Sequence, residues 1–241
     1  ANSLTTPTYS TLVNDLNENL QVKILNPLSN DLSIMRQTLL FGGLESIAYN
    51  INRKNTDLKY FEFGKTYAKT LSGYEEYKHM ALFATGNTTQ SNWNITSQVV
   101  DFFNFKGYIE AALLRMGINK FNVQPIESDI FSEGMTYYVG DRKIIDFGLV
   151  KKTILKNFDI KQEVFFADFK WDNVLTLISA KIKFTEIPKF PVVKRDLALL
   201  INSDVAFNKI YQTVKLVDKN LITDVSLFDV YEGDKLPEGK K

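Results

Sequence analysis

The sequence predicts an α+β protein in which a mostly antiparallel sheet with long helices is followed by a shorter β-α-β region. Three observations lead to this prediction. An amphipathic helix pattern runs directly into an aromatic strand, further strands follow one another across short polar turns, and the pattern restarts after a basic, proline-containing stretch. The chain has 241 residues, of which 44% are hydrophobic, so it can bury a large core as one large or two ordinary domains.

The first long helix is predicted to begin after Asp31, whose carboxylate can accept the amide protons of a first helical turn. Apolar residues then recur at nearly helical spacing from Ile34 to Ile51. Arg53 follows, a cation that suits a helix C-terminus. Gly42-Gly43 lies inside this helix and indicates close packing or a kink, because neither a P-loop nor a Gly-x-Gly fingerprint surrounds it.

The elements that follow alternate between strands and helices. An aromatic strand over 60–67 is expected to pair antiparallel with a strand over 78–86, and a second amphipathic helix ends at Gly117. This second helix is expected over 97–116. The remaining expected elements of the first region are a strand at 121–125, a hairpin of 135–139 and 143–150, a helix at 151–158, a strand at 163–170 and a helix at 171–179.

A domain boundary is predicted at the basic segment KIKFTEIPKFP, residues 181–191, because its two prolines are typical of a linker. We therefore divide the chain into 1–185 and 186–241. The second region reads as a strand at 197–201, a helix at 205–216 and a strand at 225–231. Two strands and one helix make a thin core, so we expect its partner strands to lie beyond residue 241.

Composition excludes several classes of function. The 29 basic and 28 acidic residues nearly cancel, so no global charge favours nucleic acid or a membrane surface. The absence of cysteine rules out disulfides, thiolate metal sites and a thiol nucleophile, and is compatible with a cytoplasmic protein. No apolar run is long enough to span a membrane, and the start of the chain has no signal-peptide pattern.

No catalytic or metal-binding set emerges from the residue pattern. His79 is the single histidine and lies in an apolar strand, where a structural role is favoured over a catalytic one. The acidic pairs Glu75-Glu76 and Asp168/Asp172 are interpreted as solvated carboxylates. Basic and aromatic residues alternate late in the chain, which fits either a phosphate backbone or a solvated linker: Lys181, Lys183, Phe184, Lys189, Phe190, Lys194 and Arg195.

Several short sequence motifs, taken together, resemble those of the β subunit of bacterial phenylalanyl-tRNA synthetase. Those of the first region are Asn26-Pro27-Leu28-Ser29, Met35-Arg36-Gln37-Thr38-Leu39, Asn50-Ile51-Asn52-Arg53, Phe61-Glu62-Phe63-Gly64-Lys65 and Val100-Asp101-Phe102-Phe103-Asn104-Phe105-Lys106-Gly107. The later ones are Phe190-Pro191, Lys194-Arg195-Asp196-Leu197-Ala198, Leu227-Phe228-Asp229-Val230-Tyr231-Glu232-Gly233 and Glu238-Gly239-Lys240-Lys241. The chain departs from the family where Phe131-Ser132-Glu133-Gly134 replaces a His-Pro-Gly and where Lys151-Lys152 replaces a later His-Pro.

The resemblance implies a class II aminoacyl-tRNA synthetase-like antiparallel sheet that does not catalyse, followed by a truncated ferredoxin-like anticodon-binding domain. Catalytic class II enzymes carry an arginine for the ATP α-phosphate and a glutamate two residues later, where this chain has Ala68 and Thr70. An alanine can neither neutralise nor hydrogen-bond a phosphate. The glycine-rich third motif of those enzymes is also absent, and Arg36, which we place on the first helix, does not replace the missing arginine.

The implied function is that of part of a phenylalanine–tRNA ligase, in which this region scaffolds the catalytic α subunit of an (αβ)₂ tetramer and helps to bind the anticodon of tRNA(Phe). ATP and magnesium would serve the whole enzyme, with no cofactor on this chain. The resemblance makes Lys194, Arg195, Lys240 and Lys241 candidates for tRNA binding. The structural alternative for Arg195 is an internal ion pair with Asp196.

Two other functions are kept as rivals. One is a freestanding enzyme that activates a carboxylate with ATP, against which Ala68 argues. The other is a non-enzymatic RNA-binding protein, against which the near-zero net charge argues.

Overall fold

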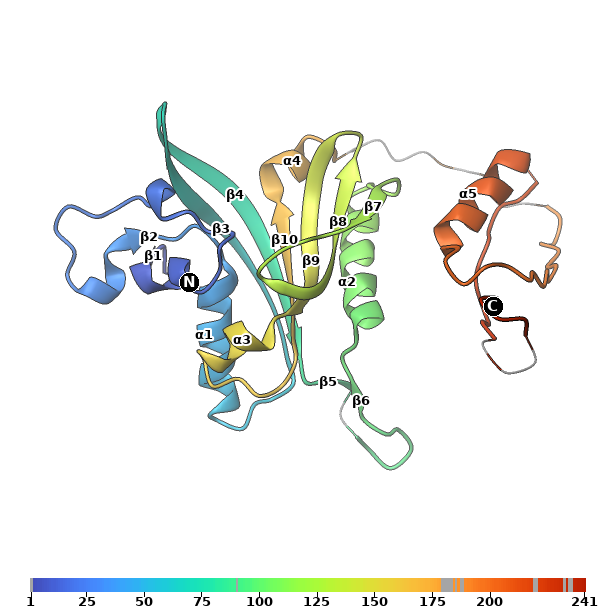
Figure 1. The fold of residues 1–241 in the computed structure, drawn as a ribbon, viewed down its shortest axis with the longest axis horizontal. Coiled ribbons are helices and arrows are strands. Elements are labelled where there is room, and N and C mark those ends of the chain that lie inside the picture. The colour runs from blue at the N-terminus through green and yellow to red at the C-terminus, as the bar shows by residue number, and fades with distance from the viewer. Residues whose placement is uncertain are drawn as a thin grey trace. The chain divides into compact units, whose positions relative to one another are not determined.

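The computed structural model describes residues 2–89, 91–178, 184, 186, 189–218, 221–231, 233 and 236–241. The chain forms two compact units, Ala1–Lys183 and Phe184–Lys241 (Figure 1). Most of the expected linker at 181–191 lies outside the described residues, so the boundary between 185 and 186 stays a prediction.

The first unit is built on an antiparallel sheet of six strands in the order β3-β4-β10-β9-β8-β7. Aromatic and β-branched residues dominate these strands, which suits a pleated surface covered on both sides. The strands are β3 (Leu58–Thr70), β4 (Gly73–Thr85), β7 (Asn122–Pro125), β8 (Phe131–Val139), β9 (Arg142–Val150) and β10 (Val164–Lys170). The expected antiparallel pairing of the first two and the hairpin turn at Gly140 are confirmed.

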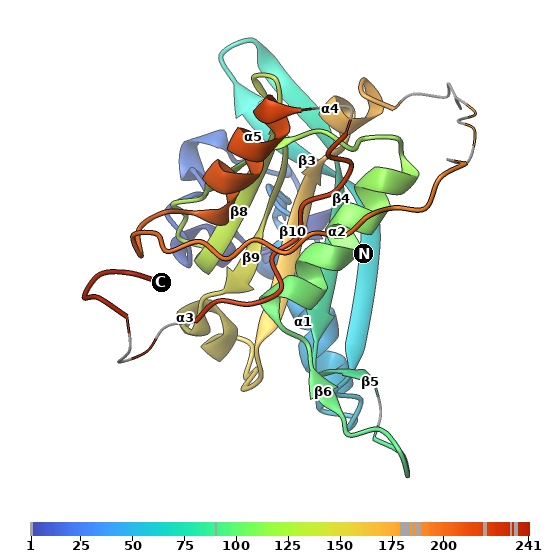
Figure 2. The same cartoon turned by 90° about the vertical axis from the view of Figure 1, so that its right-hand side faces the viewer.

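Helices cover the two faces of the sheet separately. Helix α1 (Leu40–Ile51) packs on one face with α3 (Lys152–Lys156), around buried side chains such as Phe83 and Phe166. Helix α2 (Phe102–Arg115) packs on the other face, around Phe105, Ile109 and Phe147, with α4 (Trp171–Leu175) at its end. Figures 1 and 2 show α1 and α2 on opposite sides of the sheet. The predicted antiparallel sheet with long helices is confirmed, and the structure adds that it has three layers.

The start of the first helix is the main correction to the sequence analysis. Asp31 lies in a short 3-10 turn, Asn30–Leu32, and Ile34–Met35 form strand β2, which pairs with β1 (Leu4–Thr5). Helix α1 therefore begins at Leu40, and no side chain caps it. Ile34 and Met35 fall at nearly helical spacing in the sequence, but they pair with strand β1, about thirty residues earlier. Arg36 thus lies ahead of the helix rather than on it.

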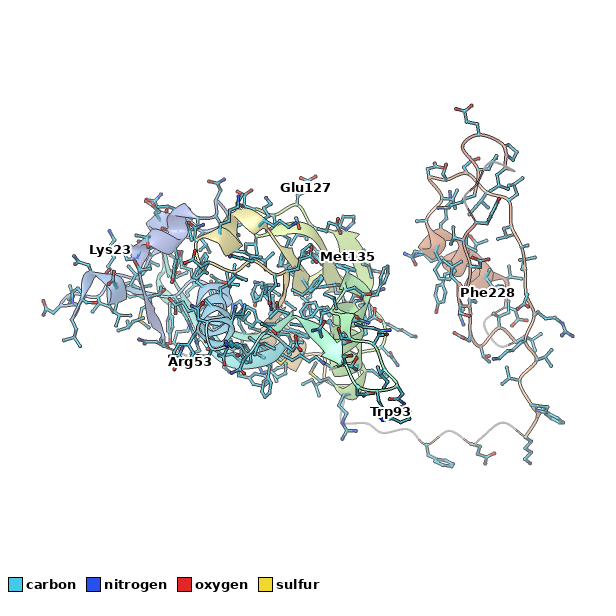
Figure 3. The ribbon with its side chains drawn as sticks, turned by 90° about the horizontal axis from the view of Figure 1, so that it is seen from below. Lys23, Arg53, Trp93, Glu127, Met135 and Phe228 are labelled. Atoms are coloured by element: carbon cyan, nitrogen blue, oxygen red, sulfur yellow. The ribbon has the colours of Figure 1, made fainter. Side chains whose placement is uncertain are left out.

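The rest of α1 and the end of α2 agree with the prediction, whereas α2 begins at Phe102 rather than at 97, because Gln98–Val99 form strand β6. Gly43 lies so close to β4 that an added Cβ would come within 2.1 Å of Phe83 Cζ, so this glycine permits close packing. Figure 3 shows Arg53 just after the end of α1, where its guanidinium lies 3.4 Å from the centre of the Tyr49 ring. Helix α2 begins with a capping box at Asp101 and is followed by Gly117 at φ 79°.

The second unit contains helix α5 (Phe207–Val217), close to the predicted span. The strands expected at 197–201 and 225–231 do not form among the described residues. The prediction of a β-α-β unit is therefore wrong for its two strands. Their apolar side chains stay exposed, with Leu197 at 73% and Phe228 at 77%. A strand is stabilised by its neighbours, and here the described pairing is a single bridge between Asn202 and Lys240.

The smaller elements are β5 (Asn87–Thr89) and β6 (Gln98–Val99), which form a hairpin beyond the end of β4. None of the described helices has the length and apolar character needed to cross a membrane.

Candidate functional site

One face of the sheet changes from apolar to polar along its strands. The strand register brings five residues from five strands into a row on the face that α1 covers farther along: Glu62, Ala81, Asp168, Asp146 and Thr136. The next row toward the β3–β4 turn contains Gly64, His79 and Lys170. We call Glu62, Asp168 and Asp146 the carboxylate row.

Each member of the carboxylate row has a cation of its own. Arg36 Nη1 lies 2.7 Å from Glu62 Oε1, and Lys170 Nζ lies 2.7 Å from Asp168 Oδ2. Lys143 Nζ lies 3.0 Å from Asp146 Oδ2. Three half-buried carboxylates would otherwise repel one another on a face with little water. The pairing therefore makes the row nearly neutral.

The centre of the row is a three-membered cluster of Asp168, His79 and Lys170. His79 Nδ1 lies 2.6 Å from Asp168 Oδ1, and both side chains are largely buried. Burial alone would raise the pKa of Asp168, but Lys170 and His79 outweigh it and lower the pKa to about 2. Burial likewise opposes the charge of Lys170, yet Asp168 holds the pKa of Lys170 above its ordinary value. The interpretation of Asp168 as a solvated carboxylate is therefore wrong.

Arg36 acts as a structural link. Its Nε donates to the carbonyl of Lys65 at 2.9 Å, and its Nη1 reaches the carbonyl of Asn2 at 3.4 Å besides Glu62. Gly64 leaves room for the guanidinium, because an added Cβ would lie 2.2 Å from Arg36 Nη2. The contacts with Glu62 and Lys65 hold the segment before α1 against β3, and the contact with Asn2 holds the start of the chain. The guanidinium is therefore engaged in structural contacts.

The hairpin between β3 and β4 carries the positions where catalytic relatives of this fold would need charge. Ala68 lies opposite Glu75 in the ladder. The hydroxyls of Thr70 and Ser72 each donate to Glu75 Oε1 at 3.0 Å, and the Tyr77 hydroxyl donates to Oε2. Chiefly because of the bond from Tyr77, the pKa of Glu75 is lowered. The carboxylate at this turn is thus saturated by neutral donors, and Ala68 offers no group to a phosphate.

A pocket of about 360 Å³ opens beside the cluster, with Thr66, Ala68, His79 and Lys170 in its wall. Several other polar residues that line it are hydrogen-bonded within the protein. The backbone N–H of Lys78 donates to Asp172 Oδ2 at 2.8 Å, and Asn173 Nδ2 donates to the carbonyl of Lys143 at 2.8 Å. No group of three or more His, Asp or Glu side chains within the described ranges could hold a metal ion.

The four candidate tRNA-binding residues lie in the second unit. Lys240 Nζ donates to Asn202 Oδ1 at 2.6 Å, and Lys241 Nζ donates to the carbonyl of Ser203 at 2.8 Å. Lys194 and Arg195 are exposed, and Arg195 Nη1 donates to the carbonyl of Lys194 at 3.1 Å.

The structure therefore brings Lys240 and Lys241 together at one bridge, and no described contact joins them to Lys194 or Arg195. Among the described residues no ion pair links Arg195 to Asp196, so the structural alternative for Arg195 does not form. The proposed role of these four residues stays a prediction.

Sequence reasoning missed the carboxylate row. Glu62 lies more than eighty residues before Asp146 and Asp168, and the three meet only through the register of four strands. A usable signal was present, since Glu62, Asp146 and Asp168 each interrupt an apolar strand with a carboxylate.

Comparison with known proteins adds a family to this geometry. Residues 1–171 match the model described as "Phenylalanyl tRNA synthetase beta chain CLM domain", and residues 188–241 match "Ferredoxin-fold anticodon binding domain". The phenylalanine–tRNA ligase beta subunit of Bacteroides thetaiotaomicron is 43% identical over all of this chain and 31% of its own length. That of Porphyromonas gingivalis is 36% identical with the same coverage, so the chain spans about a third of these relatives.

A solved structure also resembles the fold. Pyrrolysyl-tRNA synthetase from Desulfitobacterium hafniense matches with a TM-score of 0.54 over 73% of this chain and 61% of that one. The identity is 15%, so the likeness concerns the fold alone. It confirms the predicted antiparallel-sheet fold of a class II synthetase.

Proposed function

Because this chain belongs to the family of phenylalanyl-tRNA synthetase beta chains, we propose that its first unit scaffolds a catalytic alpha chain and performs no chemistry itself. The whole assembly would be an (αβ)₂ phenylalanine–tRNA ligase in the cytoplasm that charges tRNA(Phe) with ATP and magnesium. The curated relatives are about three times as long as this chain, so these activities and partners are part of the proposal.

One observation carries the non-catalytic role: the polar face of the sheet is already neutralised by its own residues. Binding ATP would need cations that are free to meet phosphates, and binding magnesium would need carboxylates free to meet the ion. Arg36, Lys170 and Lys143 are instead paired with the carboxylate row. The residues present do not fit either ligand, and we derive no catalytic step from them.

The first test separates scaffold from enzyme. The chain alone should show no phenylalanine-dependent exchange between ATP and pyrophosphate, whereas the alpha chain should be captured by it in a pull-down. Exchange activity in the purified chain would favour the rival ATP-dependent enzyme. Failure to retain the alpha chain, with an unrelated protein as control, would remove the scaffold role.

We further propose that the second unit contributes to anticodon binding through Lys194, Arg195, Lys240 and Lys241. Support comes from its match to an anticodon-binding domain and from the exposure of Lys194 and Arg195. In the complete enzyme, Lys194→Glu should weaken tRNA(Phe) binding several-fold, and more strongly at low salt, because phosphate contacts are screened by ions. Lys161→Glu, an exposed lysine of the first unit, is the control. An equal salt slope for both variants would exclude Lys194.

A further inference from the structure

The two edges of the sheet differ in length and protection. Strand β7 (Asn122–Pro125) forms one edge and has four residues, the last of which is a proline. Strand β3 ends the other side with thirteen residues, Leu58–Thr70. Proteins normally shield a long edge strand, because its unpaired backbone groups can pair with another chain.

Part of the β3 edge is shielded by the chain itself. The backbone N–H of Tyr67 donates to the carbonyl of Arg36 at 3.0 Å, and the carbonyl of Lys65 accepts from Arg36 Nε. These bonds show that Tyr67 and Lys65 point their backbone groups away from β4. Strand groups alternate with a period of two, so the same holds for Lys59, Phe61 and Phe63. Among the described residues, the backbone groups of these three have no partner outside the sheet.

Two aromatic side chains of this open stretch are also largely exposed to solvent. Phe61 is 71% exposed and Phe63 is 54% exposed, although both lie in the longest edge strand of the sheet. Phe63 makes an edge contact with Trp171 at 4.8 Å, and the Phe61 and Phe63 rings lie 6.2 Å apart. These rings form a continuous aromatic surface beside free backbone donors and acceptors. Lys59 borders this surface, and its Nζ donates to the carbonyl of Thr88 at 3.1 Å and lies 5.3 Å from the centre of the Tyr108 ring. Among the described residues no carboxylate lies within ion-pair distance of Lys59, so its charge is not neutralised.

We propose that residues 59–63 of β3 accept an extended segment of a different polypeptide as a further antiparallel strand. Backbone hydrogen bonds would supply affinity and alternate side chains would supply specificity, as in strand addition generally. Read from its N-terminus, the partner segment has an apolar residue opposite Phe63, another opposite Phe61, and an acidic residue opposite Lys59. This proposal concerns an edge of the first unit and does not depend on the scaffold or anticodon roles.

A second copy of this chain fits the edge less well. A twofold pair centred on Phe61 would set each Lys59 opposite a Phe63 of the other copy. Neither lysine would then meet a carboxylate, so this pairing gains no ion pair across the two strands. Charge complementarity therefore favours an acidic partner that differs from this chain.

The test uses the full chain and a blocked peptide, Thr-Val-Thr-Val-Thr-Glu-Thr. Two further peptides carry one N-methyl group each, on the central valine, whose amide faces β3, or on the following threonine, whose amide faces away. The parent peptide and the second variant should bind, and the first should bind at least about tenfold more weakly because it loses an edge hydrogen bond. Amide exchange at Phe61 and Phe63 should slow only with the binding peptides.

Protein variants complete the test. Phe61→Thr keeps a strand-forming residue at the edge and should lower affinity at least about tenfold, whereas Phe103→Thr, at an exposed phenylalanine on α2, should not. Absence of binding at millimolar peptide, or equal binding of both N-methyl peptides, would overturn the proposal. Dimerisation of the chain that Phe61→Thr abolishes, measured by sedimentation, would overturn the choice of a different polypeptide.

Discussion

Replacing Lys170 by methionine tests the account of the buried cluster. Methionine keeps an unbranched side chain that is one atom shorter, and it removes the cation that lies 2.7 Å from Asp168. The structure lowers the pKa of Asp168 from 3.8 to about 2. Each unit of pKa is worth about 1.4 kcal/mol, so the ionised carboxylate contributes on the order of 2 kcal/mol at neutral pH. Lys170→Met should remove most of that stability.

The lowered pKa of Asp168 also predicts how the stability difference between Lys170→Met and the parent chain depends on pH. The folded-state pKa of Asp168 is lowered, so its contribution is fully present above the unfolded-state pKa of 3.8 and is lost as pH falls toward about 2. In Lys170→Met this acid-side loss should be smaller, because the carboxyl group then protonates at a higher pH in the folded state. The variant and the parent chain should therefore converge in stability near the acid end.

The assay is urea unfolding followed by tryptophan fluorescence at several pH values. Trp171 directly follows Lys170 and contacts Phe63, so its emission reports on this part of the first unit. Lys161→Met, at an exposed lysine, is the matched control and should change stability by less than about 0.5 kcal/mol. Equal behaviour of the two variants, or a loss in Lys170→Met that does not depend on pH, would refute the reasoning.

Three further predictions concern single contacts. Gly43→Ala should destabilise the first unit by about 1–3 kcal/mol in urea unfolding, because its Cβ would overlap the ring of Phe83. Asp101→Ala should cost about 1 kcal/mol and fray the start of α2 in amide exchange, whereas Asp101→Asn should retain most of the cap. Tyr137→Phe should lose about 1 kcal/mol with the 2.8 Å bond to Glu110. Burial raises the pKa of Tyr137, so the parent chain should also lose stability above about pH 10, and this loss should be smaller in the phenylalanine variant.

Much of the first unit could be predicted because its signals are local. Aromatic residues alternate along β3, Gly140 marks the β8–β9 turn, and Gly117 follows the end of α2. Each of these signals acts on residues only a few positions away. Local chemistry then decides the outcome, and the prediction agrees with the structure.

The start of α1 could not be found in this way. Ile34 and Met35 fall at positions that also suit a helix, but they pair with Thr5 and Leu4 about thirty residues earlier. The choice between helix and strand was made by a tertiary contact that periodicity does not record. The same limit applies to the carboxylate row, whose three members come from three different strands.

The second unit shows the opposite limit. The apolar runs at 197–201 and 225–231 have strand character in the sequence, and only the helix between them forms as predicted. A strand pattern states what a segment can do once its edges and faces are covered. It does not state whether the neighbours that cover them are present.

The carboxylate row also determines which strand alignments are permitted. Sliding β10 by one residue would turn Asp168 and Lys170 together onto the face that α2 covers, among apolar side chains such as Phe105 and Phe147. It would also take Asp168 away from His79, whose Nδ1 lies 2.6 Å from Asp168 Oδ1 in the observed register. The buried charges thus penalise this misaligned sheet while adding little net attraction to the correct one. In an aromatic-rich sheet, where apolar side chains can substitute for one another, buried charges help to select a single register.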